Sequence, residues 1–450
     1  MQASGVSTRQ KALNILGRIE KDGAFSTLLL GHVLASGAVD PIDSRLLSHL
    51  VYGVLKRLNT LDWVVDHHLR RKKHLRPVIR NILRLGTYQL LFMNSIPSYA
   101  ACSTSVELVR TMSRNVSEAG FVNAVLRNIT RRPELKLPDE TDDEAGYVSL
   151  KHSHPRWLVK RWLKRWGPEA ARRICQANNR TPAVTLRVNT SAISREAFIR
   201  KLEILDIKAR EGNLAPDTVR IPRRSFSRLQ PVAKKLYSVQ DEASVLVGHL
   251  LRPVPGERIL DLCAGLGTKT LHILDLVRGQ AAVTALDIHR FKLEKLAGRI
   301  RECGFTEPQL VCRDALAGTL FKEIGLFDKV LVDAPCSGLG TVRHKPELKW
   351  RAYPEKLRDL SRLQTTLLKA AAMCLKPGGI LLYATCSTEP DENGQVIDML
   401  LESSRELEPA ALPGLDDLSL DFVEMGDTRL SLSPHVHGTD GFFVAAVTRV

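Results

Sequence analysis

The sequence has few cysteines and no long apolar run. Its eight cysteines are spread over 450 residues without a Cys-x-x-Cys pair, so we expect neither a disulfide framework nor a structural zinc site. No stretch approaches the roughly eighteen apolar residues of a membrane-spanning helix, and the amino terminus has neither the basic nor the apolar region of a secretory signal. These absences predict a cytoplasmic protein that binds neither a metal ion nor a membrane.

Positive charge is abundant by contrast, and it is concentrated in the first half of the chain. The formal net charge is +16. Residues 51–100 carry 9 Lys and Arg against 2 acidic residues, and residues 151–200 carry 12 against 2, whereas residues 401–450 carry 3 against 9. Clustered Lys and Arg attract the phosphates of nucleic acids. One basic window is as readily an ordinary solvated surface, but two such windows beside a catalytic domain favour RNA or DNA as the partner.

The spacing of apolar residues predicts three domains. Residues 1–135 have apolar positions recurring at three and four, which indicates an all-α bundle, and the acidic, proline-flanked residues 136–150 suit a linker. Residues 151–232 combine a basic helix with strand-like segments and predict a small α+β module. From residue 233 to 450, alternating strands and helices predict an α/β domain with a doubly wound, Rossmann-like parallel sheet.

Two cysteines follow predicted strands of this α/β domain. Cys336 lies in Asp-Ala-Pro-Cys-Ser-Gly, residues 333–338, and Cys386 lies in Ala-Thr-Cys-Ser-Thr, residues 384–388. Ligands of open α/β sheets bind beyond the carboxyl ends of the strands, so we expect both thiols to face one substrate. A free cysteine is usually a buried structural residue, but the polar neighbours of Cys386 disfavour that reading.

A glycine-containing loop follows the first predicted strand of the same domain. The loop consists of Cys263, Ala264, Gly265, Leu266, Gly267, Thr268 and Lys269. Glycines let a backbone approach a ligand, yet the spacing fits neither the dinucleotide fingerprint nor the P-loop. Carboxylates follow the next three strands, at Asp287, Asp314 and Asp333. Without phosphate-binding machinery they favour a cationic, nucleoside-like cofactor such as S-adenosylmethionine, although each aspartate alone could instead cap a helix or a turn.

Three of these segments resemble known sequence motifs. Residues 261–270, 333–338 and 384–388 look like motifs I, IV and VI of the RNA (cytosine-5)-methyltransferases, and residues 237–244 and 440–443 are also similar to that family. The helical start of the chain resembles the NusB-like RNA-binding domain that precedes the catalytic region in the bacterial 16S rRNA (cytosine-5)-methyltransferase B family of the Sun or Fmu type. The resemblance covers nearly the whole chain.

The resemblance implies a function and a role for several residues. It implies that carbon 5 of a specific cytosine in 16S rRNA is methylated with S-adenosylmethionine through a covalent cysteine–RNA intermediate. Cys386 would be the nucleophile and Cys336 the residue that assists product release. Asp333 would hold the cytosine ring, and Lys269 would orient the cofactor loop or the base. The cofactor would contact the seven loop residues together with Asp287, Asp314 and Asp333.

One departure and several alternatives remain at this point. The loop of that family commonly reads Cys-Ala-Ala-Pro-Gly-Gly-Lys, whereas this chain has Leu266 and Thr268 in place of a proline and a glycine. The substrate could instead be tRNA or another structured RNA, or the chain could be a catalytically silent RNA-binding adaptor. A DNA cytosine-5 methyltransferase would not require Cys386, and an amino-group methyltransferase would carry an Asn/Asp-Pro-Pro-Tyr/Phe motif. We expect a monomer.

Overall fold

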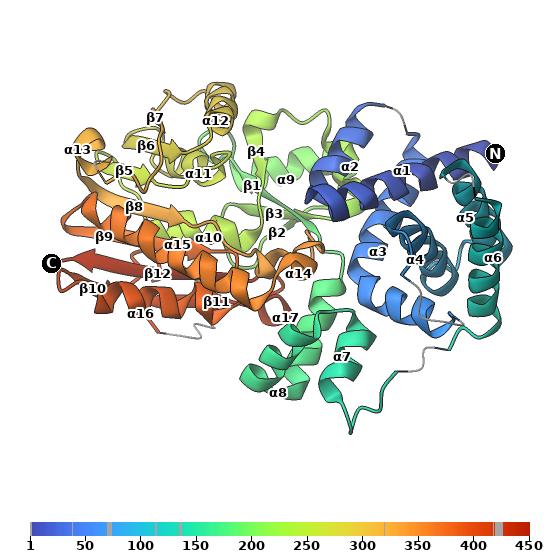
Figure 1. The fold of residues 1–450 in the computed structure, drawn as a ribbon. Helices are drawn as coiled ribbons and strands as arrows, with labels where there is room; N and C mark the ends of the chain where they lie inside the picture. The colour runs from blue at the N-terminus through green and yellow to red at the C-terminus, as the bar shows by residue number, and fades with distance from the viewer. Residues whose placement is uncertain are drawn as a thin grey trace. The chain divides into compact units, whose positions relative to one another are not determined.

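The computed structural model describes residues 2–37, 39–69, 74–112, 115–134, 137–318, 320–416, 418 and 426–450. The chain divides into two compact units (Figure 1). The first unit contains residues 1–180 and 344–351, and the second contains residues 181–343 and 352–450. No helix within the described ranges combines the length and the apolar character needed to cross a membrane.

The first unit is built from helices alone within its described residues. These are α1 (Gln2–Asp22), α2 (Ser26–Ala35), α3 (Pro41–His67), α4 (Pro77–Phe92), α5 (Ser98–Met112), α6 (Val116–Arg131), α7 (Glu144–His152), α8 (Arg156–Asn179) and α14 (Leu348–Arg351). Apolar residues that recur at three and four lie on one face of each long helix. Leu50 and Val54 of α3 thereby meet Leu83 of α4 in one core, where all three are fully buried. The predicted helical bundle is confirmed.

A short segment from late in the chain packs within this first unit. It comprises residues 344–351 and contains two buried charged side chains, Glu347 and Lys349. The Glu347 carboxylate accepts hydrogen bonds from the backbone N–H of Ser26 at 2.9 Å and from its hydroxyl. The Lys349 Nζ atom donates to the carbonyl oxygen of Lys56 at 3.1 Å, and burial lowers the pKa of Lys349 well below its usual value. Buried charges are tolerated only with such partners, so the segment is firmly anchored in the helical unit.

The second unit begins with a small antiparallel sheet. Its strand order is β2-β3-β1-β4, and its strands are β1 (Val184–Val188), β2 (Arg210–Glu211), β3 (Thr218–Ile221) and β4 (Tyr237–Val239). Helix α9 (Arg195–Ile204) covers one face, where Phe198 packs with Leu186 and Val219 in a buried cluster. Two 3-10 helices, η1 (Arg223–Leu229) and η2 (Lys234–Leu236), precede the last strand. These strands and α9 form the predicted α+β module, whereas the basic helix expected in it, α8, belongs to the first unit.

A larger mixed sheet forms the rest of the second unit. Its strand order is β10-β12-β9-β8-β5-β6-β7, with β11 paired to β12. The strands are β5 (Arg258–Asp261), β6 (Ala282–Asp287), β7 (Gln309–Cys312), β8 (Phe327–Asp333), β9 (Leu375–Thr385), β10 (Leu407–Ala410), β11 (Arg429–Leu432) and β12 (Phe442–Arg449). Strands β5 to β9 are parallel as predicted, whereas β12 runs antiparallel to β9.

Helices cover both faces of this large sheet. They are α10 (Glu242–Leu251), α11 (Thr268–Leu276), α12 (Arg290–Cys303), α13 (Leu320–Ile324), α15 (Pro354–Met373), α16 (Gly394–Glu402) and α17 (Pro434–His437). Residues of α10, α11 and α12 share one buried core with the sheet, and residues of α15 and α16 share another with the opposite face. The predicted doubly wound, Rossmann-like domain is therefore confirmed.

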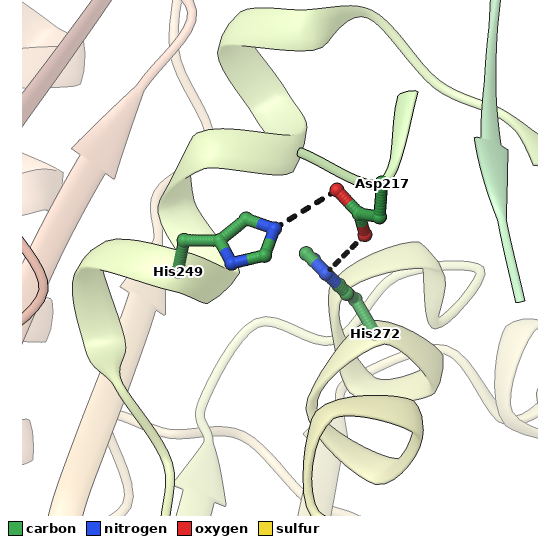
Figure 2. Close-up of side chains that lie close together, drawn as sticks. All are labelled: Asp217, His249 and His272. Carbon is green, nitrogen blue, oxygen red and sulfur yellow. Dashed lines mark hydrogen bonds and ion pairs between the residues drawn. The ribbon is translucent and has the colours of Figure 1, made fainter. Parts of the chain in front are cut away.

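A buried carboxylate joins the small sheet to two helices of the large domain. Asp217 directly precedes β3, while His249 lies on α10 and His272 on α11 (Figure 2). The Asp217 Oδ1 atom lies 2.9 Å from His249 Nε2, and Asp217 Oδ2 lies 2.9 Å from His272 Nε2. One potential ligand atom from each residue lies within 4.8 Å of the others. Three ligand atoms this close together could bind one metal ion. The expectation that the protein binds no metal is therefore not confirmed by the structure.

This cluster is expected to make stability depend on pH. Burial and the nearby charge of Arg187 lower the pKa of His272 to about 4. In the unfolded chain the imidazole of His272 has a pKa near 6.5. Between pH 6.5 and about pH 4 the unfolded chain therefore binds more protons than the folded chain. The unfolding free energy should therefore fall by on the order of 3 kcal/mol as the pH drops from about 7 to about 4.

Denaturant titrations at several pH values measure this dependence. His272→Gln carries no titratable imidazole and should flatten the curve through this range. The matched control is His289→Gln, since His289 is exposed in the same unit and its loss should leave the dependence unchanged. Equal pH dependence in the wild type and in His272→Gln would contradict the expectation.

Candidate active site

Two thiols meet at the carboxyl ends of neighbouring strands. Strands β8 and β9 are parallel, and Asp333 at the end of β8 pairs with Ala384 of β9. Because the strands are in this register, Cys336 and Cys386, each a few residues further on, come together with their Sγ atoms 3.3 Å apart. Both cysteines are free and partly buried. The structure thus brings together the two cysteines that the sequence singled out.

The surroundings of the Cys336 thiol stabilise its protonated form. The hydrogen bond to Cys386 raises the pKa of Cys336 well above its usual value, and burial adds to the effect. Negative charge on Cys386, Glu392 and Asp333 acts in the same direction. Cys336 therefore holds its proton more strongly than an ordinary cysteine does.

A lysine from the glycine-containing loop contacts Asp333, which lies at the same edge of the sheet as the two thiols. Lys269 is nearly buried at the start of α11, and its Nζ atom lies 2.5 Å from Asp333 Oδ2. The same Nζ atom lies 5.3 Å from the centre of the Phe442 ring, close enough for a cation–π contact. The Asp333 side chain is 34% exposed, so one carboxylate is held by the lysine and still open to a ligand.

Glycine geometry shapes the loop between β5 and α11. Gly265 and Gly267 have φ values of 58° and 76°, in the left-handed region that other residues rarely adopt. A Cβ atom at Gly267 would lie 2.0 Å from the side chain of Leu296 on α12. The substituted Leu266 is about half exposed, between the two glycines. The departures from the common loop sequence therefore leave its two turning points in place.

Strand-end aspartates differ in how they are held. Asp287 is buried, and its carboxylate accepts from the backbone N–H of Gly265 at 3.0 Å and of His289 at 2.8 Å. Asp314 is exposed, and its carboxylate accepts from the backbone N–H of Leu316 at 2.9 Å, as in a turn. Asp287 therefore fixes two loops at this edge of the sheet, whereas Asp314 organises its own turn.

Asp261, at the end of β5, is a residue that sequence reasoning did not select. It is almost fully buried and accepts from the Thr270 hydroxyl at 2.7 Å. Burial raises the pKa of Asp261 to about 6, and the charge of Asp333 adds to the rise. Its place at the start of the glycine-containing loop was the available signal. Burial of a carboxylate, however, cannot be read from a strand end alone.

A close backbone contact ties the terminal strand to the cysteine loops. Gly340 donates its N–H to the carbonyl oxygen of Cys386 and accepts from the N–H of Gly441, both at 2.9 Å. A Cβ atom at Gly340 would lie 1.9 Å from the Gly441 carbonyl oxygen. Only glycine permits this approach. The contact places the segment of residues 440–443 directly beside the loops that carry the two cysteines.

Comparisons with known proteins agree with this architecture. A NusB family model matches residues 6–131, and a model of the ferredoxin-like domain of RsmF/B-like methyltransferases matches residues 154–225. The model described as 16S rRNA methyltransferase RsmB/F matches residues 248–448. A solved structure, PH0851, superposes with a TM-score of 0.84 and 26% identity, covering 99% of this chain and 98% of that chain.

Relatives extend over the full chain. The probable ribosomal RNA small subunit methyltransferase B of Bacillus subtilis is 34% identical over 453 residues, covering 98% of this chain and 99% of the relative. The ribosomal RNA small subunit methyltransferase B of Klebsiella pneumoniae is 33% identical over 414 residues, or 90% of each chain. Fold and relatives together define an RNA methyltransferase. The chain belongs to the ribosomal RNA small subunit methyltransferase B family.

Proposed function

We propose that the protein methylates carbon 5 of a cytosine in 16S rRNA with S-adenosylmethionine, through a covalent bond to Cys386. The observation that carries this proposal is the pair of thiols, with Sγ atoms 3.3 Å apart at adjacent strand ends. Methylation of a ring nitrogen or an amino group would need no cysteine. A cytosine carbon needs one, because carbon 5 becomes nucleophilic only after a nucleophile has added to carbon 6.

The residues at the strand ends have different roles in this reaction. The Cys386 thiolate adds to carbon 6 of the cytosine. Asp333, held by Lys269, hydrogen-bonds the ring and stabilises the adduct. When bound, S-adenosylmethionine supplies the electrophilic methyl group. Loss of the proton from carbon 5 then allows the carbon 6–sulfur bond to break, which returns the thiolate to Cys386.

Cys336 is suited to the release step for an electrostatic reason. The hydrogen bond and the negative charge of Cys386 are two of the causes that keep the proton on Cys336. Once Cys386 is bonded to carbon 6, its sulfur is a neutral thioether and both causes disappear. Cys336 then loses its own proton to solvent more easily, and the resulting thiolate can accept the proton that leaves carbon 5.

The carboxyl edge of the sheet has the chemistry that this cofactor requires. The left-handed turns at Gly265 and Gly267 bring the loop backbone to the start of α11. Carboxylates at this edge suit ribose hydroxyls, an amino group and a sulfonium better than phosphates. The residues proposed to contact the cofactor are Cys263, Ala264, Gly265, Leu266, Gly267, Thr268, Lys269, Asp287, Asp314 and Asp333.

Bisulfite sequencing of 16S rRNA tests the proposed reaction. RNA from cells with the gene should retain one cytosine that is converted in RNA from cells without it, because 5-methylcytosine resists bisulfite. Adding back the wild-type gene should restore the protected position. Identical conversion in all three samples would overturn the choice of 16S rRNA, and protection of a tRNA position instead would redirect the proposal to that substrate.

RNA binding is proposed to use the basic helix of the first unit. Lys160 and Lys164 are one turn apart on α8, and both are exposed. If each contacts a phosphate, the double variant Lys160→Gln/Lys164→Gln should bind RNA more weakly and show a salt slope smaller by about 1.5. Filter binding between low and moderate salt measures the slope. Lys369→Gln, an exposed lysine of α15, is the control, and an unchanged slope in the double variant would contradict the expectation.

A further inference from the structure

A buried glutamate lies directly behind the two cysteines. Glu392 ends the 3-10 helix η4 (Pro390–Glu392) and is completely buried. Its Oε1 atom accepts from the Ser337 N–H at 2.7 Å and from Gln364 Nε2 at 3.2 Å. Its Oε2 atom accepts from the hydroxyls of Ser337 at 2.5 Å and Ser387 at 2.6 Å. Each oxygen thus receives two hydrogen bonds, which is the full capacity of a carboxylate.

The two serines are the residues that directly follow the two cysteines. Ser337 follows Cys336 and Ser387 follows Cys386. The two Oγ atoms lie 3.3 Å apart, the same separation as the two Sγ atoms. One carboxylate therefore fixes both cysteine loops at the position next to each thiol.

Glu392 is itself fixed to the sheet that carries the cysteines. Its backbone carbonyl oxygen accepts from the Tyr383 hydroxyl at 2.6 Å, and Tyr383 is a buried residue of β9. Gln364 of α15 extends the link, since its Nε2 atom also donates to the carbonyl oxygen of Pro335 at 3.0 Å. The glutamate thus transmits the rigidity of β9 and α15 to the two loops.

We propose that Glu392 is a positioning residue that sets the relative placement of the Cys336 and Cys386 thiols through Ser337 and Ser387. This inference rests on the proposed function, because it assumes that both thiols take part in the reaction. The negative charge of Glu392 has a second effect on the site, because it contributes to raising the pKa of Cys336. Glu392 touches no reacting atom and acts through the two serines.

Glu392→Gln tests both effects with the shape of the side chain retained. The amide places an NH₂ group where an oxygen received two hydroxyl protons, and it removes the charge. We expect kcat to fall about 100-fold, because small displacements of reacting groups cost this much. The KM for RNA and the affinity for S-adenosylhomocysteine should stay within about twofold, since neither ligand is expected to touch this carboxylate.

Alkylation of the thiols supplies a readout that a merely structural role would not move. Iodoacetamide labelling of Cys336, followed by mass spectrometry across pH, should show a midpoint at lower pH in Glu392→Gln than in the wild type. Glu392→Asp keeps the charge and should keep a midpoint closer to that of the wild type. Glu402→Gln changes an exposed glutamate of α16 and should alter neither kcat nor labelling.

Each result supports or overturns the proposal. A kcat within twofold of the wild type in Glu392→Gln would overturn it. So would a loss of activity with unchanged labelling and a matching loss of melting temperature, since that pattern is one of general destabilisation. Labelling needs no RNA, so it tests the positioning role independently of the reaction. If the midpoint shifts but the wild-type protein methylates no cytosine, the positioning role stands and the proposed function is overturned.

Discussion

Cys386→Ala is expected to abolish methyl transfer to RNA while leaving cofactor binding intact. The substitution removes the sulfur that adds to carbon 6, and loss of a covalent nucleophile costs at least about 1,000-fold in rate. The Cys386 side chain is partly exposed, so the fold should tolerate the change. Incorporation of a radiolabelled methyl group measures transfer, and calorimetry with S-adenosylhomocysteine measures binding at the cofactor site.

The control for this variant is another free cysteine of the same unit. Cys303 is partly exposed at the end of α12, and Cys303→Ala should keep its activity. Full activity in Cys386→Ala would exclude it as the nucleophile. Loss of both transfer and cofactor binding would also count against the assignment, because it would indicate damage to the loop between β5 and α11.

Cys336→Ala is expected to trap the enzyme on its RNA. Attack by Cys386 should still occur, but the proton on carbon 5 would leave slowly and the carbon 6–sulfur bond would persist. The adduct should appear as a band of reduced mobility that withstands denaturant and disappears after treatment with ribonuclease. Mass spectrometry of the digested band should locate the nucleotide on Cys386.

The double variant Cys336→Ala/Cys386→Ala separates the two roles. It should form no adduct, because it lacks the attacking sulfur. An inactive Cys336→Ala protein without any adduct would contradict the release role and would favour a part for Cys336 in the attack itself. An adduct in the double variant would mean that a third residue bonds to RNA.

The fold could be predicted largely because its signals are local. Apolar residues at three and four predicted the helices of the first unit, and strand–helix alternation predicted the large sheet. The direction of β12 was not predictable, since antiparallel pairing with β9 depends on where a distant strand docks. The same limit applies to residues 344–351, whose charged sequence gives no indication that Glu347 and Lys349 become buried.

In the candidate site, too, some residues could be predicted from local sequence and others could not. Cys336, Cys386, Asp333 and Lys269 each follow or precede a predicted element, so their gathering at one edge of the sheet follows from topology. Glu392 could not be selected, because within an acidic run the sequence does not distinguish a buried carboxylate from solvated ones. The assignment of Asp314 to the cofactor stays a prediction, and its exposed position in a turn adds no contact in its favour.

Residues 344–351 also affect when the first unit can complete its packing during synthesis. The other residues of the helical unit end at Arg180, so more than 160 residues of the second unit are synthesised before this segment exists. A nascent chain that stops at Arg180 lacks the partners of Ser26 and Lys56. The first unit to leave the ribosome is therefore the one that must wait for a late segment before its packing is complete.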